Sequence, residues 1–317
     1  MQAPDEGDGN VMESIVALVA TTMNAGTPLL LAALGIVISE RSGVVNLGIE
    51  GIMLVAAVLG FTIVHWTGSY GLGFVAGALA GAALAVLFGA MTLGLLTNQF
   101  ATGLALALFG AGLSAFIGQP LQGLTLPARA HDGIPVLQDI PVLGPALFGH
   151  HWLVYGALAL AGAVAWFLFR TRGGLVLRAV GESPESAHAL GYPVRRIRFA
   201  ALAFGGACAG LAGAYLSTVY TPLWSEGMVA GRGWIALALV TFATWRPGRV
   251  LLGAYLFGGV TMLQFHLQGL GIEVATQLLA MTPYLATIVV LALISRNPRW
   301  IRLNMPASLG KPFNPNA

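Results

Sequence analysis

The sequence predicts an all-α polytopic membrane protein, and two observations carry this prediction. Its 317 residues are 57% hydrophobic and only 9% charged, whereas a soluble globular domain carries about 25% charged residues. The apolar residues also gather in long runs, and a membrane-spanning helix needs about 20 of them. These runs fill the chain and leave no room for a large soluble domain. We therefore expect one transmembrane domain over residues 1–317.

Nine helical spans can be placed on these runs. They cover residues 14–38, 45–65, 72–96, 99–118, 151–169, 199–220, 229–245, 249–267 and 274–295. Two glycine pairs, Gly77 with Gly81 and Gly206 with Gly210, have the spacing that lets helices pack closely in lipid. Trp245 lies near the end of a span, where aromatic side chains usually form an interfacial belt.

The basic residues predict the orientation, because short cytoplasmic loops are enriched in Lys and Arg. One side holds only Arg129 and Arg232, and the other holds thirteen: Arg41, Arg170, Arg172, Arg178, Arg195, Arg196, Arg198, Arg246, Arg249, Arg296, Arg299, Arg302 and Lys311. The N-terminus is then outside and the C-terminus cytoplasmic, which agrees with an odd number of spans. Residues 119–150, with five prolines, form an outer loop or short re-entrant cover, and residues 170–198 form a cytoplasmic loop.

Glu50 is the only acidic residue within a predicted span, and the orientation puts it near the cytoplasmic mouth of span 45–65. A charge inside a bilayer costs about 2.5–3.5 kcal/mol on insertion scales, so such residues usually face protein or water. Glu50 is either a carboxylate stabilised by the dipole of its own helix or part of an inner gate. Asn46 could cap the same helix or contact a polar solute.

A second segment combines an acidic residue with glycines just before span 229–245. Glu226 and Gly227 are followed by Gly231, Arg232 and Gly233. Glycine-interrupted helices in corresponding halves of a chain are a pointer to a transport site between repeats. The two segments could therefore belong to an inverted repeat.

The cytoplasmic loop predicts a helix of about two turns. Ser183 is a suitable N-cap, Pro184 suits the first helical position, and Glu185 favours the positive end of the helix dipole. Gly191 can close the helix, while Ala187 and Leu190 offer small or apolar contacts. Such a helix either lies on the lipid surface or docks a cytoplasmic partner.

Several segments carry a resemblance to a known family. The loop RAVGESPESAHALGYPVRRIRFAALAFGGACAGLAGAYLS resembles the coupling loop of ATP-binding cassette importer permeases, in the branch that handles nucleosides, simple sugars and branched-chain amino acids. ERSGVVNLGIEGIML and NQFATGLALALFGAGLSAFIG are similar to segments of the same branch. GRGWIALALVTFATWRPG and PASLGKPF resemble its nucleoside-type members. The matching segments run from about residue 27 to residue 313.

This resemblance implies a bacterial inner-membrane permease that pairs with a second homologous permease, a cytoplasmic ATPase subunit and an extracytoplasmic substrate-binding protein. The residues implied in ATPase coupling are Glu182, Ser183, Pro184, Glu185, Ala187, Leu190 and Gly191. The chain lacks the glycine-rich phosphate-binding loop, so the partner would hydrolyse ATP–Mg and this chain would bind no cofactor itself. The implied substrate is a nucleoside or related purine compound, with simple sugars or branched-chain amino acids as alternatives.

A nucleoside needs hydrogen-bond partners and a flat apolar surface. Asn98, Gln99, Phe100 and Trp234 could supply both, with Asn46 and Glu50 as polar members of a gate, although each is also explained by packing or an interface. A secondary transporter with Glu50 as its proton site is a further alternative, disfavoured by the lack of other intramembrane acids. The sequence offers no catalytic constellation and no nucleic-acid motif. It offers no metal site either, because His150 and His151 lack further ligands.

Overall fold

The computed structural model describes residues 6–127, 133–134, 137–269, 281, 285, 289 and 304–314. The regular secondary structure of this part is helical, apart from one isolated β-bridge between Thr125 and Leu223. The α-helices are α1 (Glu6–Arg41), α2 (Ile49–Thr67), α3 (Tyr70–Gly89), α4 (Gln99–Gly118), α5 (Trp152–Arg170), α6 (Arg172–Glu182), α7 (Pro184–Ala189), α8 (Val194–Tyr215), α9 (Arg232–Phe242) and α10 (Pro247–Gly269). Short π-helical turns at Ala90–Gly94, Gly144–Phe148 and Leu216–Tyr220 and a 3₁₀ turn at Gln119–Leu121 complete them.

Within the described residues, seven helices are long and apolar enough to cross a membrane. They are Glu13–Arg41, Ile49–Thr67, Tyr70–Gly94, Gln99–Leu121, Trp152–Arg170, Val194–Tyr220 and Pro247–Gln268. Each corresponds to one of the nine predicted spans. The predicted span 274–295 lies outside the described residues.

The prediction of a full span over residues 229–245 is wrong. Helix α9 has 11 residues, which extend about 16 Å, whereas the hydrocarbon core of a bilayer is about 30 Å thick. Gly231 precedes α9 with a φ of 80°, and Thr244 and Trp245 follow it with φ values of 52° and 54°. A left-handed backbone cannot continue an α-helix, so these residues limit α9 at both ends.

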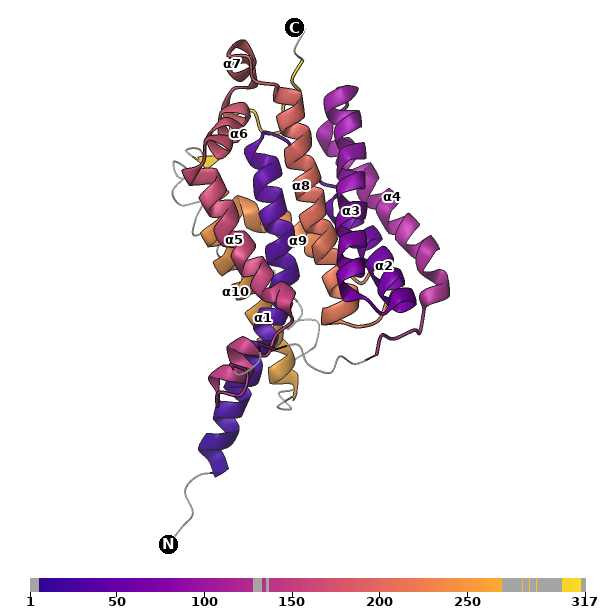
Figure 1. Cartoon of the computed structure of the whole chain (residues 1–317), viewed down its shortest axis with the longest axis vertical. Helices are drawn as coiled ribbons and strands as arrows, with labels where there is room; N and C mark the ends of the chain where they lie inside the picture. The colour runs from indigo at the N-terminus through magenta and orange to yellow at the C-terminus, as the bar shows by residue number, and fades with distance from the viewer. Residues whose placement is uncertain are drawn as a thin grey trace.

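Helix α8 lies at the centre of the bundle, between α1 and α3 (Figure 1). Helices α2 and α4 lie on the α3 side, and α5 and α10 pack on the α1 side. A Cβ atom on Gly81 would lie 2.1 Å from the carbonyl oxygen of Gly206, and one on Gly210 would lie 2.1 Å from that of Gly77. The two predicted glycine pairs therefore pack against each other, and the prediction of close helix packing is confirmed.

Replacing Gly81 with Ala should destabilise the protein by about 1–3 kcal/mol, because the new methyl group overpacks the α3–α8 contact. Gly112→Ala is the matched control, since a Cβ atom there would meet nothing within 4 Å. Alanine is also the better helix former, by about 1 kcal/mol. Thermal unfolding of the purified protein in detergent measures both effects. Equal melting temperatures for the two variants would contradict the packing argument.

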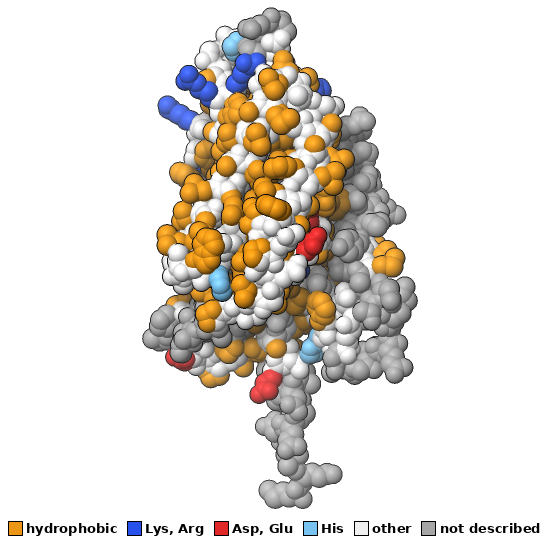
Figure 2. Space-filling view, turned by 90° about the vertical axis from the view of Figure 1, so that its right-hand side faces the viewer, with side chains coloured by type: hydrophobic (Ala, Val, Ile, Leu, Met, Phe, Trp, Pro, Cys, Tyr) orange, Lys and Arg blue, Asp and Glu red, His pale blue; other side chains and the backbone are white. Residues whose placement is uncertain are grey.

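The two ends of the bundle differ in charge. Helices α6 and α7 lie at one end, together with the C-terminal segment 304–314, and α1 begins at the other (Figure 1). On the face shown in Figure 2, the Lys and Arg side chains gather at the first of these ends, which we call the α7 end. This is the charge asymmetry on which the predicted orientation rests, and the orientation itself stays a prediction.

Candidate functional site

Glu50 joins two helices that are far apart in the sequence. It lies in the first turn of α2, and its Oε1 accepts a hydrogen bond of 2.8 Å from the backbone N–H of Gly231. Its Oε2 accepts one of 2.7 Å from the N–H of Gly233. The first N–H groups of a helix have no partner within that helix, and they carry the positive end of its dipole. Glu50 therefore caps α9 from another helix, and we call this contact the Glu50 junction.

The junction requires glycine at one position. A Cβ atom on Gly233 would lie 2.7 Å from the Cα atom of Glu50. That distance is shorter than any ordinary carbon–carbon contact, so the two backbones meet directly. The two acidic-glycine segments singled out in the sequence thus come together in the structure, while their origin in an inverted repeat stays a prediction.

Glu50 lies inside the bundle, beside α4. The segment before it runs alongside α4: Val45 is bonded to Gln99, Leu47 lies beside Gly103, and Gly51 lies beside the carbonyl groups of Leu106 and Ala107. Seven to eight residues of α4 correspond to about 11 Å, or about two turns. Glu50 therefore lies about two turns inward from the start of α4, and its place near the cytoplasmic mouth stays a prediction, as the orientation does.

This depth has a local cause, because residues 44–48 are not helical and α2 begins at Ile49 rather than at residue 45. The side chain of Asn46 accepts a 2.8 Å hydrogen bond from the N–H of Gly48, and Oε1 of Gln99 accepts one of 2.9 Å from the N–H of Val45. These side chains satisfy backbone groups that a helix would otherwise pair. Because these residues are not helical, α2 starts inside the bundle and Glu50 lies in its first turn.

The other residues predicted to contact solute fall in two places, with Asn98, Gln99 and Phe100 at the start of α4 and Trp234 at the start of α9. Asn98 caps α4 by accepting bonds of 2.9 Å and 3.1 Å from the N–H groups of Phe100 and Ala101. The ring of Phe100 is half exposed and lies beside Gly310. Trp234 lies in the first turn of α9, next to the Glu50 junction, and is partly exposed. Their contact with a solute stays a prediction.

The predicted helix of the cytoplasmic loop is present as α7. Oγ of Ser183 accepts a 3.2 Å bond from the N–H of Ser186, and Gly191 has a φ of 85°. Ala187 is buried, whereas Glu185 is exposed and Leu190 is 78% exposed. Helix α7 therefore presents an open surface at its end of the molecule.

The sequence reading missed α6, which precedes α7. Thr171 caps it, with Oγ1 accepting a 3.0 Å bond from the N–H of Gly174. Its buried residues Gly174, Leu177 and Val180 recur every three positions. The cap and this period were the signals that could have found the helix.

Residues 304–314 hold α6 and α7 in place, and we call them the C-terminal clasp. Phe313 packs with Val180 and Ala187 and meets the ring of His188 edge-on, with 5.7 Å between the ring centroids. The N–H of Ser308 donates a 3.0 Å bond to the carbonyl oxygen of Gly181. The clasp therefore contacts the helix that would dock a cytoplasmic partner.

The fully buried guanidinium of Arg198 ties the clasp to the start of the segment that leads to Glu50. Its Nε donates a 3.0 Å bond to the carbonyl oxygen of Ser42, and its Nη2 donates one of 3.0 Å to Oγ of Ser308. Its Nη1 donates a 3.5 Å bond to the carbonyl oxygen of Lys311. The N–H of Gly310 also donates a 3.1 Å bond to the carbonyl oxygen of Gly43. Sequence reasoning used Arg198 only as a marker of orientation.

Trp245 holds the far end of α9. Its indole Nε1 donates a hydrogen bond to Oε2 of Glu40, and its carbonyl oxygen accepts bonds of 3.4 Å and 3.2 Å from Nε and Nη2 of Arg41. Trp245 is 1% exposed, so its assignment to an interfacial belt is wrong. Helix α9 is thus held at both ends by carboxylate-centred contacts, with Glu50 before it and Glu40 after it.

Comparison with known proteins identifies the family. The profile of the family "Branched-chain amino acid transport system / permease component" matches residues 18–294. The chain is 40% identical over 325 residues to a "Putative glucose ABC transporter permease protein" of Haloferax volcanii, covering 96% of this chain and 99% of that one. No solved structure matches the chain.

Two further relatives are permeases for nucleosides. The identity is 36% over 299 residues with a nucleoside ABC transporter permease protein of Lactococcus lactis subsp. cremoris, covering 90% of this chain and 94% of that one. It is 32% over 300 residues with a guanosine ABC transporter permease protein of Bacillus subtilis, covering 89% and 93%. The chain therefore belongs to this permease family of ATP-binding cassette transporters and is a multi-pass membrane protein, the permease component rather than an enzyme.

Proposed function

We propose that the chain is a permease subunit of an ATP-driven importer for nucleosides or related purine compounds, with simple sugars as the second candidate. The family supports an ATPase and a binding protein as partners, and the names of two relatives support the nucleoside. The name of the relative with 40% identity favours the sugar. A second, homologous permease completes the proposed complex.

The continuous path from α7 to Glu50 is the observation that carries the proposal of external drive. An ATPase that moves α7 also moves the C-terminal clasp, which contacts α7 through Phe313. Arg198 joins the clasp to Ser42, and residues 42–48 lead to the Glu50 junction. Movement at the α7 end therefore reaches the start of α9 inside the bundle, where it alters the access of solute.

Uptake by the reconstituted complex tests the function and the substrate. Liposomes containing both permeases and the ATPase, supplied with the binding protein, should take up labelled guanosine only with ATP, and unlabelled nucleosides should compete better than glucose. Better competition by glucose would favour the sugar. Uptake that survives ATP depletion but is abolished by a protonophore would contradict the proposal and favour a secondary transporter.

Gly191→Val and Glu185→Ala should each lower the solute transported per ATP hydrolysed, by about fivefold or more. Valine at a φ of 85° adds about 1–2 kcal/mol of strain, and 1 kcal/mol is roughly a factor of five in an equilibrium. Glu185→Ala alters the exposed first turn of α7. Paired measurements of uptake and ATP hydrolysis give the ratio.

Gly68→Val is the matched control for Gly191→Val. Gly68 has a φ of 70°, and, as at Gly191, a Cβ atom there would meet nothing within 4 Å. It ends α2, away from α7. A wild-type ratio in both α7 variants, or an equal loss in the Gly68 variant, would argue against a docking role for α7.

A further inference from the structure

Two cavities share the side chain of Tyr220 as a wall. One has a volume of about 240 Å³ and is also lined by Asn24, His150 and His151. The other has a volume of about 320 Å³ and is also lined by Arg232, Thr261, Gln264 and Phe257. Both lie in the half of the bundle away from α7, between α1, α10 and the turn that follows α8. We call them together the Tyr220 chamber.

Amide and imidazole hydrogen-bonding groups line the chamber. Oδ1 of Asn24 accepts a 2.9 Å bond from the hydroxyl of Tyr215, which orients the amide. Nε2 of His150 lies 2.9 Å from the carbonyl oxygen of Ala146, while its buried Nδ1 has no hydrogen-bond partner within the described part of the chain. Gln264 is only 8% exposed and lines the larger cavity. Amide and imidazole groups provide both donors and acceptors, as solute hydroxyl groups require.

Arg232 is the one charged side chain among the described residues that line the chamber, and its position disfavours an anionic ligand. Its guanidinium lies 5.6 Å from the ring centroid of Tyr220 and donates bonds of 3.2 Å and 3.1 Å to the carbonyl oxygens of Met228 and Val229. Glu50 holds the residues on either side of Arg232. The cation is thus already engaged by a ring and two carbonyl groups, and an anion is fixed next to it.

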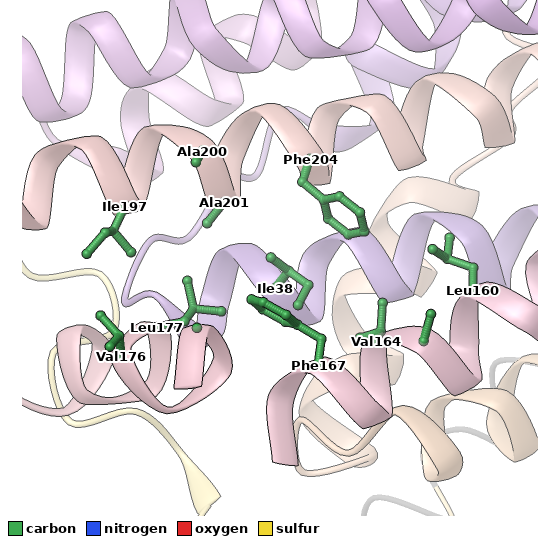
Figure 3. A pocket seen from close by; sticks show the side chains of 12 residues that line it. Ile38, Leu160, Val164, Phe167, Val176, Leu177, Ile197, Ala200, Ala201 and Phe204 are labelled. Carbon is green, nitrogen blue, oxygen red and sulfur yellow. The ribbon is translucent and has the colours of Figure 1, made fainter. Parts of the chain in front are cut away.

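A third cavity provides a contrast. It has a volume of about 520 Å³, and apolar side chains from α1, α5, α6 and α8 line it, among them Ile38, Phe167 and Phe204 (Figure 3). It therefore offers hydroxyl groups no partner. The Tyr220 chamber instead combines polar groups with aromatic faces, and its larger cavity is at the small end of the usual range for ligand sites, about 300–1,000 Å³.

We propose that the Tyr220 chamber is a binding station for a neutral polyhydroxylated ring solute, a nucleoside or simple sugar, on its way through the permease. The inference rests on the proposed importer function. Tyr220 and Phe257 offer faces for a ring, and Asn24, His150 and Gln264 offer bonds to its hydroxyl groups. Arg232 lies between Gly231 and Gly233, the two residues that Glu50 binds. Solute in the chamber therefore contacts the segment that Glu50 holds in place.

Variants of two chamber residues test the station in the reconstituted complex. Tyr220→Leu and Gln264→Leu should each raise the KM for labelled guanosine or glucose, whichever the wild-type complex transports, by about tenfold. Tyr220→Phe keeps the ring and should stay close to the wild-type KM. Phe204→Leu, in the apolar cavity, is the matched control and should leave KM unchanged. The ATPase activity of the complex shows that each variant is assembled.

The outcomes separate the station from the importer function. If the wild-type complex takes up neither solute, the proposed function and the station are both wrong. If it transports normally and Tyr220→Leu and Gln264→Leu keep the wild-type KM, the station alone is wrong. Loss of assembly in Tyr220→Leu together with a wild-type KM in Gln264→Leu would also overturn it, because the ring would then serve packing and the amide would not contact the solute.

Discussion

Glu50→Gln should lower solute uptake about tenfold or more while leaving membrane insertion and assembly intact. The carboxylate accepts two backbone bonds at the start of α9, whereas the amide keeps one acceptor and turns its NH₂ group towards the other N–H. A hydrogen bond to a charged group contributes about 1.5–3 kcal/mol to stability. A carboxylate at a helix N-terminus contributes about a further 0.3–1 kcal/mol. Losing either the hydrogen bond or the interaction with the helix dipole shifts the position of α9 in the transport cycle.

The control for this variant is Glu226→Gln, which removes an exposed carboxylate from the loop before α9. Uptake into liposomes and the yield of assembled complex are measured for both variants. Reduced uptake with normal assembly only in the Glu50 variant supports a gate. An assembly defect without a change in uptake per assembled complex would show that Glu50 serves only to hold α9.

The parts of the fold that were predicted correctly depend on local chemistry. Long apolar runs identified the spans, because a helix in lipid must satisfy its own backbone. The pair Gly77 and Gly81 predicted a close helix contact, since only small residues allow it. Helix α7 could be drawn from Ser183, Pro184 and Gly191 alone, because caps and turns are set within a few residues.

The features that were missed depend on bonds between distant segments. Glu50 and Gly231 are 181 residues apart, and Glu40 and Trp245 are 205 apart. The periodicity of a sequence does not reveal a contact between residues so far apart. Residues 45–48 were predicted to begin a helical span, but the hydrogen bond from Val45 to Gln99 holds this segment in a non-helical form. Trp245 was predicted to be an interfacial aromatic because it lies near the end of a predicted span. Its sequence position does not reveal the carboxylate that its indole contacts. The candidate site could thus be located by its unusual residues, but not assembled from them.

Arg198→Met should have the largest effect of any single change at the α7 end, lowering the free energy of unfolding by about 3 kcal/mol or more. Three hydrogen bonds from a buried cation are lost at once, and each such bond contributes about 1.5–3 kcal/mol. The carbonyl oxygen of Ser42 and the hydroxyl of Ser308 also lose their cationic donor inside the protein. Arg198→Lys should be intermediate, because one ammonium group cannot reach all the partners of a planar guanidinium. Arg196→Met, an exposed position on the same helix, is the matched control, and thermal unfolding in detergent measures all three.

Ser308→Ala separates a clasp that transmits movement from one that only braces the fold. The Ser308 hydroxyl accepts a bond from Arg198 and donates one of 2.7 Å to the carbonyl oxygen of Gly181, so it joins α8 to the end of α6. Its loss leaves the other bonds of Arg198 in place, and we expect a stability loss of only about 1–2 kcal/mol. Uptake per ATP hydrolysed should fall further than in the Arg196→Met control, because the C-terminal clasp then moves apart from α6. If stability falls while that ratio stays at the wild-type value, force from α7 reaches Glu50 through α8 and not through the clasp.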